Sequence, residues 1–375
     1  MTAAPLRVLH LTEGERFAGI EAHLANLIPA QLAAGVEVHL ATFALGPLSE
    51  EMRLVGLSPH LIERAWKYDP AAARRVRGLL ADLAIDVLHT HGYLGDIVGA
   101  LAARGRAPQV VTVHGLPEPF QGFAGWRIAA NLRLAARVMK RRAARVVAVS
   151  KTVRDHLVRA GVPEAKIAVL PSAVAPIGRD LEVRAVVREE LRVDAGALVV
   201  GFVGRLDPVK RAPLLADVAK RLDARGVPFV FVVCGDGPQR AALEDAVRRA
   251  GVAGRFRVLG HRTDVDRIVQ GLDVLAIPSA HEGVPVALLE AMSAQVVPVA
   301  FRVGGLPEAI DDGENGLLVE PGDCDAMAEA VAGLHRSADR RDALGRAARA
   351  TVEERFSPAR LAEDTRALYE GVRRR

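Results

Sequence analysis

The chain has 375 residues, of which half are apolar and only 4% are aromatic. A single hydrophobic core rarely grows beyond about 250–300 residues, so the length predicts two domains. The 50 basic and 45 acidic residues leave a net charge of only +5, so bulk charge gives no indication of nucleic-acid binding. The two cysteines, Cys234 and Cys324, exclude a disulfide framework and a cysteine metal cluster.

The beginning of the chain, MTAAPLRVLHLTEG, lacks a basic stretch followed by a long apolar one, so no signal peptide is expected. No apolar run approaches the roughly 18 residues that a membrane span needs. We therefore expect a cytoplasmic protein, either free or at the inner face of the cell membrane.

Short apolar runs alternate with helical stretches in the first half of the chain. Residues 6–12 and 36–43 are predicted strands, and the helical spacing of 20–34 between them completes a βαβ unit. Pro29 is unusual in that helix, because an interior proline costs about 3 kcal/mol. Further strands are expected at 86–92, 109–115, 145–150 and 166–171. This alternation predicts an α/β fold with a parallel, doubly wound sheet.

Residues 171–180 lose this periodicity and are rich in small residues, proline and glycine, which is typical of a linker. A second series of strands follows at 198–204, 229–235, 256–260, 273–279, 296–301 and 316–319. We predict two facing Rossmann-like domains, 1–175 and 176–375, with a ligand cleft between them. The tail from 323 onward is expected to be helical. Its last helix is expected to pack outside the sheets, and one option is that it crosses back to the first domain.

Two carboxylates stand out in the stretch from Ser279 to Leu306. Glu282 lies in the loop after the strand 273–279, and Glu290 lies in the helix that Pro285 is predicted to begin. Both are expected at the carboxyl edge of the sheet, where open α/β folds bind ligands and where they can accept hydrogen bonds from a polyhydroxyl ligand. The alternative is one helix-capping carboxylate and one solvated glutamate.

A cationic pair, Arg205 and Lys210, follows Gly204 at the end of the strand 198–204. Two cations at a strand end suit a pyrophosphate, whose charge grows as the bond to it breaks. The alternative is two surface cations at a helix start, where the helix dipole disfavours them.

Glycines at two other positions permit close approach of the backbone to a ligand. Gly235 and Gly237 follow the strand 229–235, although a structural turn explains them equally well. The third glycine of the dinucleotide fingerprint is missing, as is the lysine of a P-loop in GERFAGIE. Gly19 in that loop can admit an anion or a substrate hydroxyl, or it can simply form a tight turn.

Three histidines, His89, His91 and His114, are expected at strand ends in the first domain. They lack the spacing of a known metal motif, so metal binding is not expected. His114 precedes a glycine and is best placed to reach the cleft. The simpler interpretation of His89 and His91 is that both rings are buried and form hydrogen bonds with the backbone.

The stretch 126–145 contains seven basic residues and no acidic one. With Trp126 and the nearby Phe120 and Phe123, this helix can rest on anionic lipid. A solvated helix in an arginine-rich protein is the alternative.

Taken together, FVGRLDPVK, VCGDGP, LGHRTDV, HEGVPVALLEAM, VGGLPE and DGENGLLVEPGD resemble glycosyltransferase family 4, retaining enzymes of the GT-B architecture. The resemblance covers nearly the whole chain, and its signature is the glutamate pair Glu282 and Glu290. HTHGYLGDIVG and TVHG further resemble bacterial members that build exopolysaccharide or lipid-linked glycans.

The resemblance implies a role for each matching residue. Arg205 and Lys210 would hold the donor diphosphate, and Glu290 would bind the ribose. Glu282, with Gly283, Val284 and Pro285, would lie against the transferred sugar, and His114 would lie near the reacting centre. Gly19 and Glu21 would lie on the acceptor side, whereas Gly235, Gly237 and Arg262 would shape the base pocket. Neither a cofactor nor a metal is implied.

The implied reaction transfers a sugar from a nucleotide-diphosphate sugar to a glycan, lipid-linked or small-molecule acceptor. The anomeric configuration is retained, and the leaving phosphate oxygen accepts the acceptor's proton. Three positions depart from the family pattern: Ala18 where glycine is common, Ser172 where asparagine is frequent, and Gln295 where glycine is usual.

Other functions remain as alternatives. A sugar-nucleotide epimerase of the same architecture would consume the donor without an acceptor. A non-catalytic sugar-nucleotide-binding protein or scaffold would bind without turnover. An NAD oxidoreductase is disfavoured, because no complete fingerprint follows the first strand.

Overall fold

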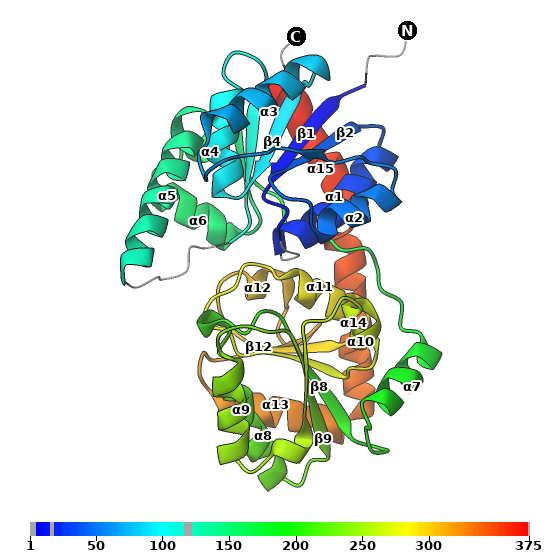
Figure 1. Ribbon diagram of the computed structural model, residues 1–375. Coiled ribbons are helices and arrows are strands. Elements are labelled where there is room, and N and C mark those ends of the chain that lie inside the picture. Colours follow the sequence, from blue (N-terminus) through cyan, green and yellow to red (C-terminus); the bar gives the residue numbers. More distant parts are fainter. Residues whose placement is uncertain (1–4, 16–18, 116–121, 374–375) are drawn as a thin grey trace. The chain divides into compact units, whose positions relative to one another are not determined.

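The computed structural model describes residues 5–15, 19–115 and 122–373, with backbone alone for 122–130. The chain forms two compact units (Figure 1). Unit 1 consists of Met1–Ala173 together with Pro358–Arg375, and unit 2 consists of Val174–Ser357. The division lies two residues before the predicted one. The last helix, for which a return to the first domain was one of the expectations, is part of unit 1.

Unit 1 contains a parallel sheet in the order β3-β2-β1-β4-β5-β6-β7. Its strands are β1 (Arg7–Thr12), β2 (Glu37–Thr42), β3 (His60–Leu61), β4 (Val87–His91), β5 (Gln109–Val113), β6 (Arg145–Ala148) and β7 (Ile167–Val169). Six of them match predicted strands. The two-residue β3 was not predicted, because it is too short to carry a hydrophobic pattern.

Helices cover both faces of this sheet, as the alternation of strands and helices requires. They are α1 (Gly19–Ala33), α2 (Pro47–Leu54), α3 (Pro70–Asp82), α4 (Tyr93–Ala102), α5 (Gly122–Arg141) and α6 (Lys151–Arg159), with the short η1 (Glu164–Lys166). One core lies between the sheet, α1 and α2, and another lies between the sheet, α3 and α4. Pro29 lies inside α1, where Leu24, Leu27 and Ile28 before it and Gln31 after it are buried.

The last helix, α15 (Pro358–Val372), packs against α1 in unit 1. Its Tyr369 is completely buried in the core that α1 and α2 form with the sheet. Residues at the very end of the sequence therefore complete the core that residues near its beginning start.

Unit 2 contains a second parallel sheet in the order β10-β9-β8-β11-β12-β13. Its strands are β8 (Leu198–Val203), β9 (Phe229–Cys234), β10 (Phe256–Gly260), β11 (Val274–Ile277), β12 (Val297–Phe301) and β13 (Leu317–Val319). Both sheets are doubly wound, which confirms the predicted fold class.

The helices of unit 2 also form two layers (Figure 1). They are α7 (Leu181–Glu190), α8 (Leu214–Ala224), α9 (Arg240–Arg249), α10 (Val265–Gln270), α11 (Val286–Ser293), α12 (Leu306–Ala309), α13 (Cys324–Arg336) and α14 (Ala338–Arg355), with η2 (Pro208–Lys210) and η3 (Ala253–Arg255). The main core joins one face of the sheet to α8, α9 and α13. In the other layer, α11 contacts both α10 and α14.

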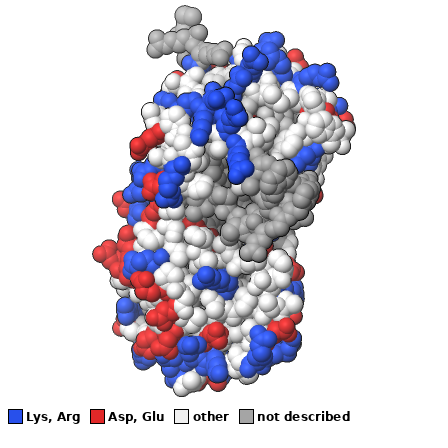
Figure 2. Space-filling view, turned by 90° about the vertical axis from the view of Figure 1, so that its left-hand side faces the viewer, with Lys and Arg blue, Asp and Glu red and all other residues white. Residues whose placement is uncertain are grey.

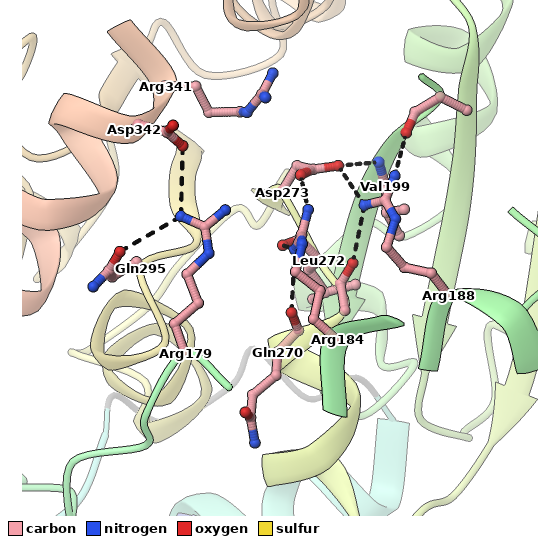
Figure 3. A network of polar contacts seen from close by, with 12 residues as sticks. Arg179, Arg184, Arg188, Val199, Gln270, Leu272, Asp273, Gln295, Arg341 and Asp342 are labelled. Atoms are coloured by element: carbon pink, nitrogen blue, oxygen red, sulfur yellow. Dashed lines mark hydrogen bonds and ion pairs between the residues drawn. The ribbon is translucent and has the colours of Figure 1, made fainter. Parts of the chain in front are cut away.

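Residues 171–180 have no regular secondary structure, and polar contacts attach their second half to unit 2 (Figure 3). The amide of Ile177 donates to Ser293 Oγ on α11 at 3.1 Å, and Arg179 reaches Gln295 Oε1 and Asp342 Oδ1, both at 3.5 Å. The predicted linker is thus fixed along one side of unit 2.

Asp273, directly before β11, joins α7 to the sheet (Figure 3). Its carboxylate pairs with Arg184 and Arg188 and accepts the amide of Val199 at 2.7 Å. Burial raises the pKa of the Asp273 carboxyl, but the two arginines and the amide outweigh burial and hold that pKa below its usual value.

Candidate functional site

The predicted donor residues lie on loops that follow parallel strands of unit 2. Gly204 follows β8, Gly235 follows β9 and Ser279 follows β11. Because the carboxyl ends of parallel strands meet at one edge of a sheet, these loops share one edge. The amide of Leu206 donates to Asp236 O at 2.9 Å, which joins the first two loops directly.

The loops after β8 and β9 approach more closely than any side chain permits. A Cβ added to Gly235 would lie 1.9 Å from Gly204 O, and the φ of Gly235 is 145°. Both facts require glycine at this position. Gly237, whose added Cβ would lie 2.8 Å from Leu206 O, stands in the same close contact. The structural turn alone is enough to explain why glycine is present at positions 235 and 237. Because glycine has no side chain, the backbone is uncovered at both positions.

Lys210 and Glu282 form a partly buried ion pair. Lys210 Nζ lies 2.6 Å from Glu282 Oε1 and 2.8 Å from Oε2, although 72 residues separate them in sequence. Ser279 Oγ also donates to Glu282 Oε1 at 2.6 Å. The side chain of Glu282 is only 8% exposed and that of Lys210 is 23% exposed, so Lys210 is the more accessible member of the pair.

The loop after β12 supports the backbone of Glu282. Gly305 donates its amide to Glu282 O at 3.0 Å, and a Cβ on Gly304 would lie 1.9 Å from that same oxygen. On the other side, the amide of Ala280 donates to Val209 O at 2.8 Å. Hydrogen bonds from two neighbouring loops therefore fix the position of the ion pair.

The two other predicted cations of unit 2 each pair with a nearby aspartate. Arg205 Nη2 lies 3.0 Å from Asp207 Oδ1, and 63% of the Arg205 side chain is exposed. Arg262 makes a bidentate contact with Asp264 at 2.8 and 2.7 Å. The alternative interpretation placed the two cations at a helix start. The helix α8 begins only at Leu214, and Lys210 is the last residue of the short η2 that precedes it.

Glu290 lies in α11, after Gly283, Val284 and Pro285 have led the chain into the helix. Pro285 is the N-cap rather than the first helical residue, and it has no side-chain acceptor for the first amides of α11. Burial, with a smaller contribution from Asp266, raises the pKa of Glu290 to about 7. Glu290 is therefore not the solvated surface glutamate of the alternative interpretation.

In unit 1, Gly19 is the first residue of α1, and a Cβ added there would meet nothing within 4 Å. Glu21 lies in the first turn of the same helix and is buried. The preceding residues of the loop, 16–18, lie outside the described part of the chain. The acceptor-side role of Gly19 stays a prediction.

His114 lies at one end of a chain of buried histidines. Its Nε2 is 3.0 Å from His91 Nδ1, and His91 Nε2 is 3.0 Å from His10 Nδ1. His89 is bonded to the hydroxyls of Tyr369 and Thr112, both at 2.6 Å. The expectation that the backbone satisfies His89 and His91 is wrong, because side chains do so.

The ring nitrogens of His10, His89 and His91 include three that lie within 4.8 Å of one another, a spacing at which a metal ion can be held. All six nitrogens of these rings already have a protein partner, the last being Gln31 Oε1, 2.9 Å from His10 Nε2. A metal ion would have to displace several of these hydrogen bonds. The arrangement is better suited to holding the rings than to binding a metal.

Comparison with known proteins identifies the family. The family described as Glycosyltransferase Family 4 matches residues 17–176, and that described as Glycosyl transferases group 1 matches residues 183–351. A 2-deoxystreptamine N-acetyl-D-glucosaminyltransferase of Streptomyces fradiae is 36% identical over 306 residues, which are 74% of this chain and 71% of that protein. The chain belongs to glycosyltransferase family 4. It is a glycosyltransferase that uses a nucleotide-sugar donor.

Solved structures show the same GT-B fold as this glycosyltransferase. HepE of Anabaena, solved in complex with UDP-glucose, is similar with a TM-score of 0.86 and 22% identity over 98% of this chain and all of that one. Sucrose-phosphate synthase of Thermosynechococcus elongatus has a TM-score of 0.78 and 20% identity, with 98% of each chain covered.

Several residues of the glycosyltransferase escaped the sequence analysis. Ser279 marked the beginning of the key stretch but was given no role, although its position three residues before Glu282 was a usable signal. His10, Gln31 and Tyr369 were not singled out. The sequence carries no signal for their meeting, since Gln31 and Tyr369 are 338 residues apart.

Proposed function

We propose that this glycosyltransferase transfers a sugar from a UDP-sugar to a small cyclitol acceptor, with retention of the anomeric configuration. The observation that carries the proposal is the Lys210–Glu282 pair, fixed by the neighbouring loops of the sheet edge in unit 2. In support of the donor, the similar HepE was solved with UDP and with UDP-glucose.

The donor diphosphate would bind beside Gly204, where Arg205 and Lys210 supply positive charge. Lys210 Nζ has three N–H donors and two bonds to Glu282, so one donor remains for a phosphate oxygen. The first amides of α11, which begins after Pro285, are a second source of positive potential.

The remaining predicted residues would surround the other parts of the donor. Glu290 would accept hydrogen bonds from the ribose hydroxyls, and Gly235, Gly237 and Arg262 would shape the base pocket. Glu282, with the backbone of Gly283 and Val284, would face the transferred sugar. In unit 1, His114 would contact that sugar, and Gly19 and Glu21 would bind on the acceptor side.

The names of relatives support a cyclitol acceptor. Two relatives, 36% and 35% identical, act on 2-deoxystreptamine, and a relative in Saccharomonospora viridis that is 31% identical is a D-inositol 3-phosphate glycosyltransferase. Each acceptor is a ring of carbons bearing hydroxyl groups, with amino or phosphate substituents. The second candidate is a glycan or lipid-linked acceptor. The name of the relative EpsF of Bacillus subtilis specifies no acceptor and is compatible with it.

In the proposed reaction the acceptor hydroxyl attacks the anomeric carbon on the face from which UDP departs. The bond between that carbon and the β-phosphate oxygen breaks, and the leaving oxygen takes the proton of the acceptor hydroxyl. Arg205 and Lys210 stabilise the charge that develops on this oxygen. No side chain has to form a covalent intermediate.

A donor screen with UDP-, GDP- and ADP-sugars tests the proposal, with 2-deoxystreptamine and D-inositol 3-phosphate as acceptors. We expect turnover with a UDP-sugar and a glycosylated cyclitol as product. Lys210→Ala should lower kcat by about 10²- to 10³-fold, because one donor to the developing charge is removed. Lys220→Ala, at an exposed position on α8, is the control.

Two results would contradict this proposal. Full activity of Lys210→Ala would refute its role at the phosphate. Consumption of the UDP-sugar without any acceptor, with an epimerised sugar nucleotide seen by NMR, would favour the epimerase instead.

We further propose that the enzyme works in the cytoplasm at a membrane surface that α5 contacts. Figure 2 shows Lys and Arg gathered on the unit 1 part of the face that carries α5, with few acidic residues among them. Arg133, Arg137 and Lys140 on α5 are exposed. Phe120 lies outside the described residues, as do the side chains of Phe123 and Trp126. No described helix is long and apolar enough to cross a membrane.

Co-sedimentation with phosphatidylserine vesicles at low salt tests this contact. The double variant Arg133→Ser/Arg137→Ser should bind more weakly by about 2 kcal/mol, since each basic residue near an anionic surface contributes about 1 kcal/mol. Arg340→Ser/Arg346→Ser on α14 removes the same charge elsewhere. Equal binding by both variants would show that α5 is not the contact.

A further inference from the structure

The histidine chain of unit 1 has a direction that the hydrogen bonds around it determine. Its members point from the strands toward α1 and α15, because residues two apart on a strand share a face. His10 and His89 are paired across β1 and β4, and His91 is paired with Thr112 across β4 and β5. They form a polar layer inside an otherwise apolar core.

The direction of donation along the hydrogen bonds is set first by two backbone carbonyls of α15. Thr365 Oγ1 lies 2.8 Å from Leu361 O and 3.0 Å from Ala362 O, and these carbonyls can only accept. The Thr365 hydroxyl must therefore donate to them and accept from Gln31, which lies 3.2 Å away. The side-chain amide of Gln31 must therefore direct its NH₂ group toward Thr365 and its oxygen away from Thr365.

The amide oxygen of Gln31 then sets the proton positions on three successive rings. Gln31 Oε1 accepts from His10 Nε2 at 2.9 Å, so the proton of His10 is on Nε2 and its Nδ1 is an acceptor. His91 Nε2 must donate to that Nδ1, and His114 Nε2 must donate to His91 Nδ1. Each neutral ring in the chain is the Nε2–H tautomer, and the opposite tautomer would place two protons or none in one hydrogen bond.

A second branch agrees with this assignment. Tyr369 OH accepts the other amide proton of Gln31 at 3.0 Å, so its own proton is available for His89 Nδ1 at 2.6 Å. His89 is then protonated on Nε2 and donates to Thr112 Oγ1. Every polar atom in this branch obtains a partner of the required kind, as buried polar groups demand.

The rings stay neutral, which the assignment requires. Burial lowers the pKa of His10 to about 4, with partial compensation by the hydrogen bond to Gln31. Burial likewise lowers the pKa values of His91 and His114, with neighbouring histidines adding repulsion.

We propose that Gln31 and Thr365 are positioning residues that hold His114 as its neutral Nε2–H tautomer, so that Nδ1 is left to accept a hydrogen bond from a hydroxyl of the transferred sugar. The proposal rests on the proposed function in one respect, namely that His114 contacts the sugar. The tautomer itself follows from contacts within unit 1 alone.

Nitrogen-15 NMR of protein labelled at histidine tests the tautomer, because protonated and unprotonated ring nitrogens have separate chemical shifts. The signals of His114 are assigned with His114→Ala. In the unaltered enzyme we expect His114 to be protonated at Nε2 only. Gln31→Leu removes the acceptor at the origin of the chain, and its His114 signals should shift toward a mixture of tautomers.

The same variants are assayed for transfer. Gln31→Leu should lower kcat roughly tenfold, the effect of one lost hydrogen bond, with the KM for the donor little changed. Thr365→Val, which is nearly isosteric, should shift the His114 signals in the same direction and covers the case in which Gln31→Leu does not fold. Gln109→Leu is the matched control, since this buried glutamine bonds Thr90 and the backbone of Asp96 instead.

A His114 protonated at Nδ1 in the unaltered enzyme would overturn the proposal, as would His114 signals that neither Gln31→Leu nor Thr365→Val changes. If His114→Ala abolishes transfer in that case, the proposed function of His114 survives without the positioning residues. If the tautomers shift as expected but His114→Ala keeps full kcat, the role of His114 in transfer is refuted.

Discussion

At the scale of single residues, the two cations that we propose for donor binding each pair with a carboxylate. Lys210 is held by Glu282, and Arg205 lies beside Asp207. A partly buried charge without a partner would be costly, because it loses its contact with water. The two contacts with Glu282 hold the ammonium group of Lys210 in one position.

Glu290 gives donor binding a predicted pH dependence. Its pKa of about 7 means that the carboxyl is mostly protonated at pH 6 and mostly ionised at pH 8. The ionised form accepts two hydrogen bonds from ribose hydroxyls, so the donor should favour it. If only this form binds, the Kd for the UDP-sugar falls about tenfold from pH 6 to pH 8. Isothermal titration calorimetry at several pH values measures it.

Glu290→Gln is the deciding variant, because the amide has no charge to lose in this range. It should bind the donor with a Kd that is independent of pH, whereas the exposed control Glu314→Gln should keep the slope. An unchanged slope in Glu290→Gln would assign the titration to another group.

At the scale of elements, the strands were predictable because buried parallel strands appear as uninterrupted apolar runs. Glutamine at position 295 was expected to matter only through the loop geometry. The structure gives it φ 62°, a left-handed conformation that costs about 1 kcal/mol or more for a residue with a side chain. This explains why glycine is usual in the family at that position.

The attachment of α7 to the sheet depends on one aspartate. The side chain of Asp273 is 4% exposed and balances Arg184 and Arg188. Asp273→Ala leaves two partly buried guanidinium groups and the Val199 amide without that acceptor. We expect the free energy of unfolding of unit 2 to fall by about 3–5 kcal/mol.

Urea denaturation followed by circular dichroism measures this loss. Arg179→Ala is the control, since its contacts are long and it should change stability by less than about 1 kcal/mol. Both tryptophans of the chain, Trp66 and Trp126, belong to unit 1. The fluorescence transition should therefore stay in place, and a shift in fluorescence alone would contradict the assignment to unit 2.

At the scale of the whole molecule, the sequence predicted two doubly wound sheets, but not the interior of unit 1. Local patterns identify strands and strand-end glycines because each depends on neighbouring residues. The histidine layer depends on β1, β4, α1 and α15 meeting in space. Periodicity along one element carries no information about such a meeting, so His10 and Tyr369 appeared as ordinary strand and helix residues.

The histidine layer of unit 1 and Glu290 of unit 2 give the two units opposite responses to acid. Next to the layer lies His23, a buried residue of α1 whose ring centre is 4.8 Å from that of His114. The native-state pKa is about 4 for His10 and about 3 for His23, below the usual value of 6.5, so the unfolded chain binds more protons below pH 6.5. Stability from these groups is fully present above pH 6.5 and is lost as the pH falls toward 4. His89, His91 and His114 act in the same direction, whereas Asp96, with a pKa raised to about 7 by burial, opposes them.

Unit 2 responds with the other sign through Glu290. Its native pKa of about 7 exceeds the usual 4.5, so its contribution is present below pH 4.5 and is lost as the pH rises through 7. Lowering the pH from 7 to 5 should thus destabilise unit 1 and slightly stabilise unit 2. Each net proton changes the free energy of unfolding by about 1.4 kcal/mol per pH unit.

Urea titrations at pH 5, 6 and 7 separate the two responses, because tryptophan fluorescence follows unit 1 and circular dichroism follows both units. The fluorescence midpoint should fall with pH, and His23→Gln should reduce that slope by about one proton, since Gln can still bond Ser172 without titrating. His261→Gln, at an exposed position in unit 2, should leave the slope unchanged. A fluorescence midpoint that rises on acidification would mean that Asp96, rather than the histidine layer, dominates the interior of unit 1.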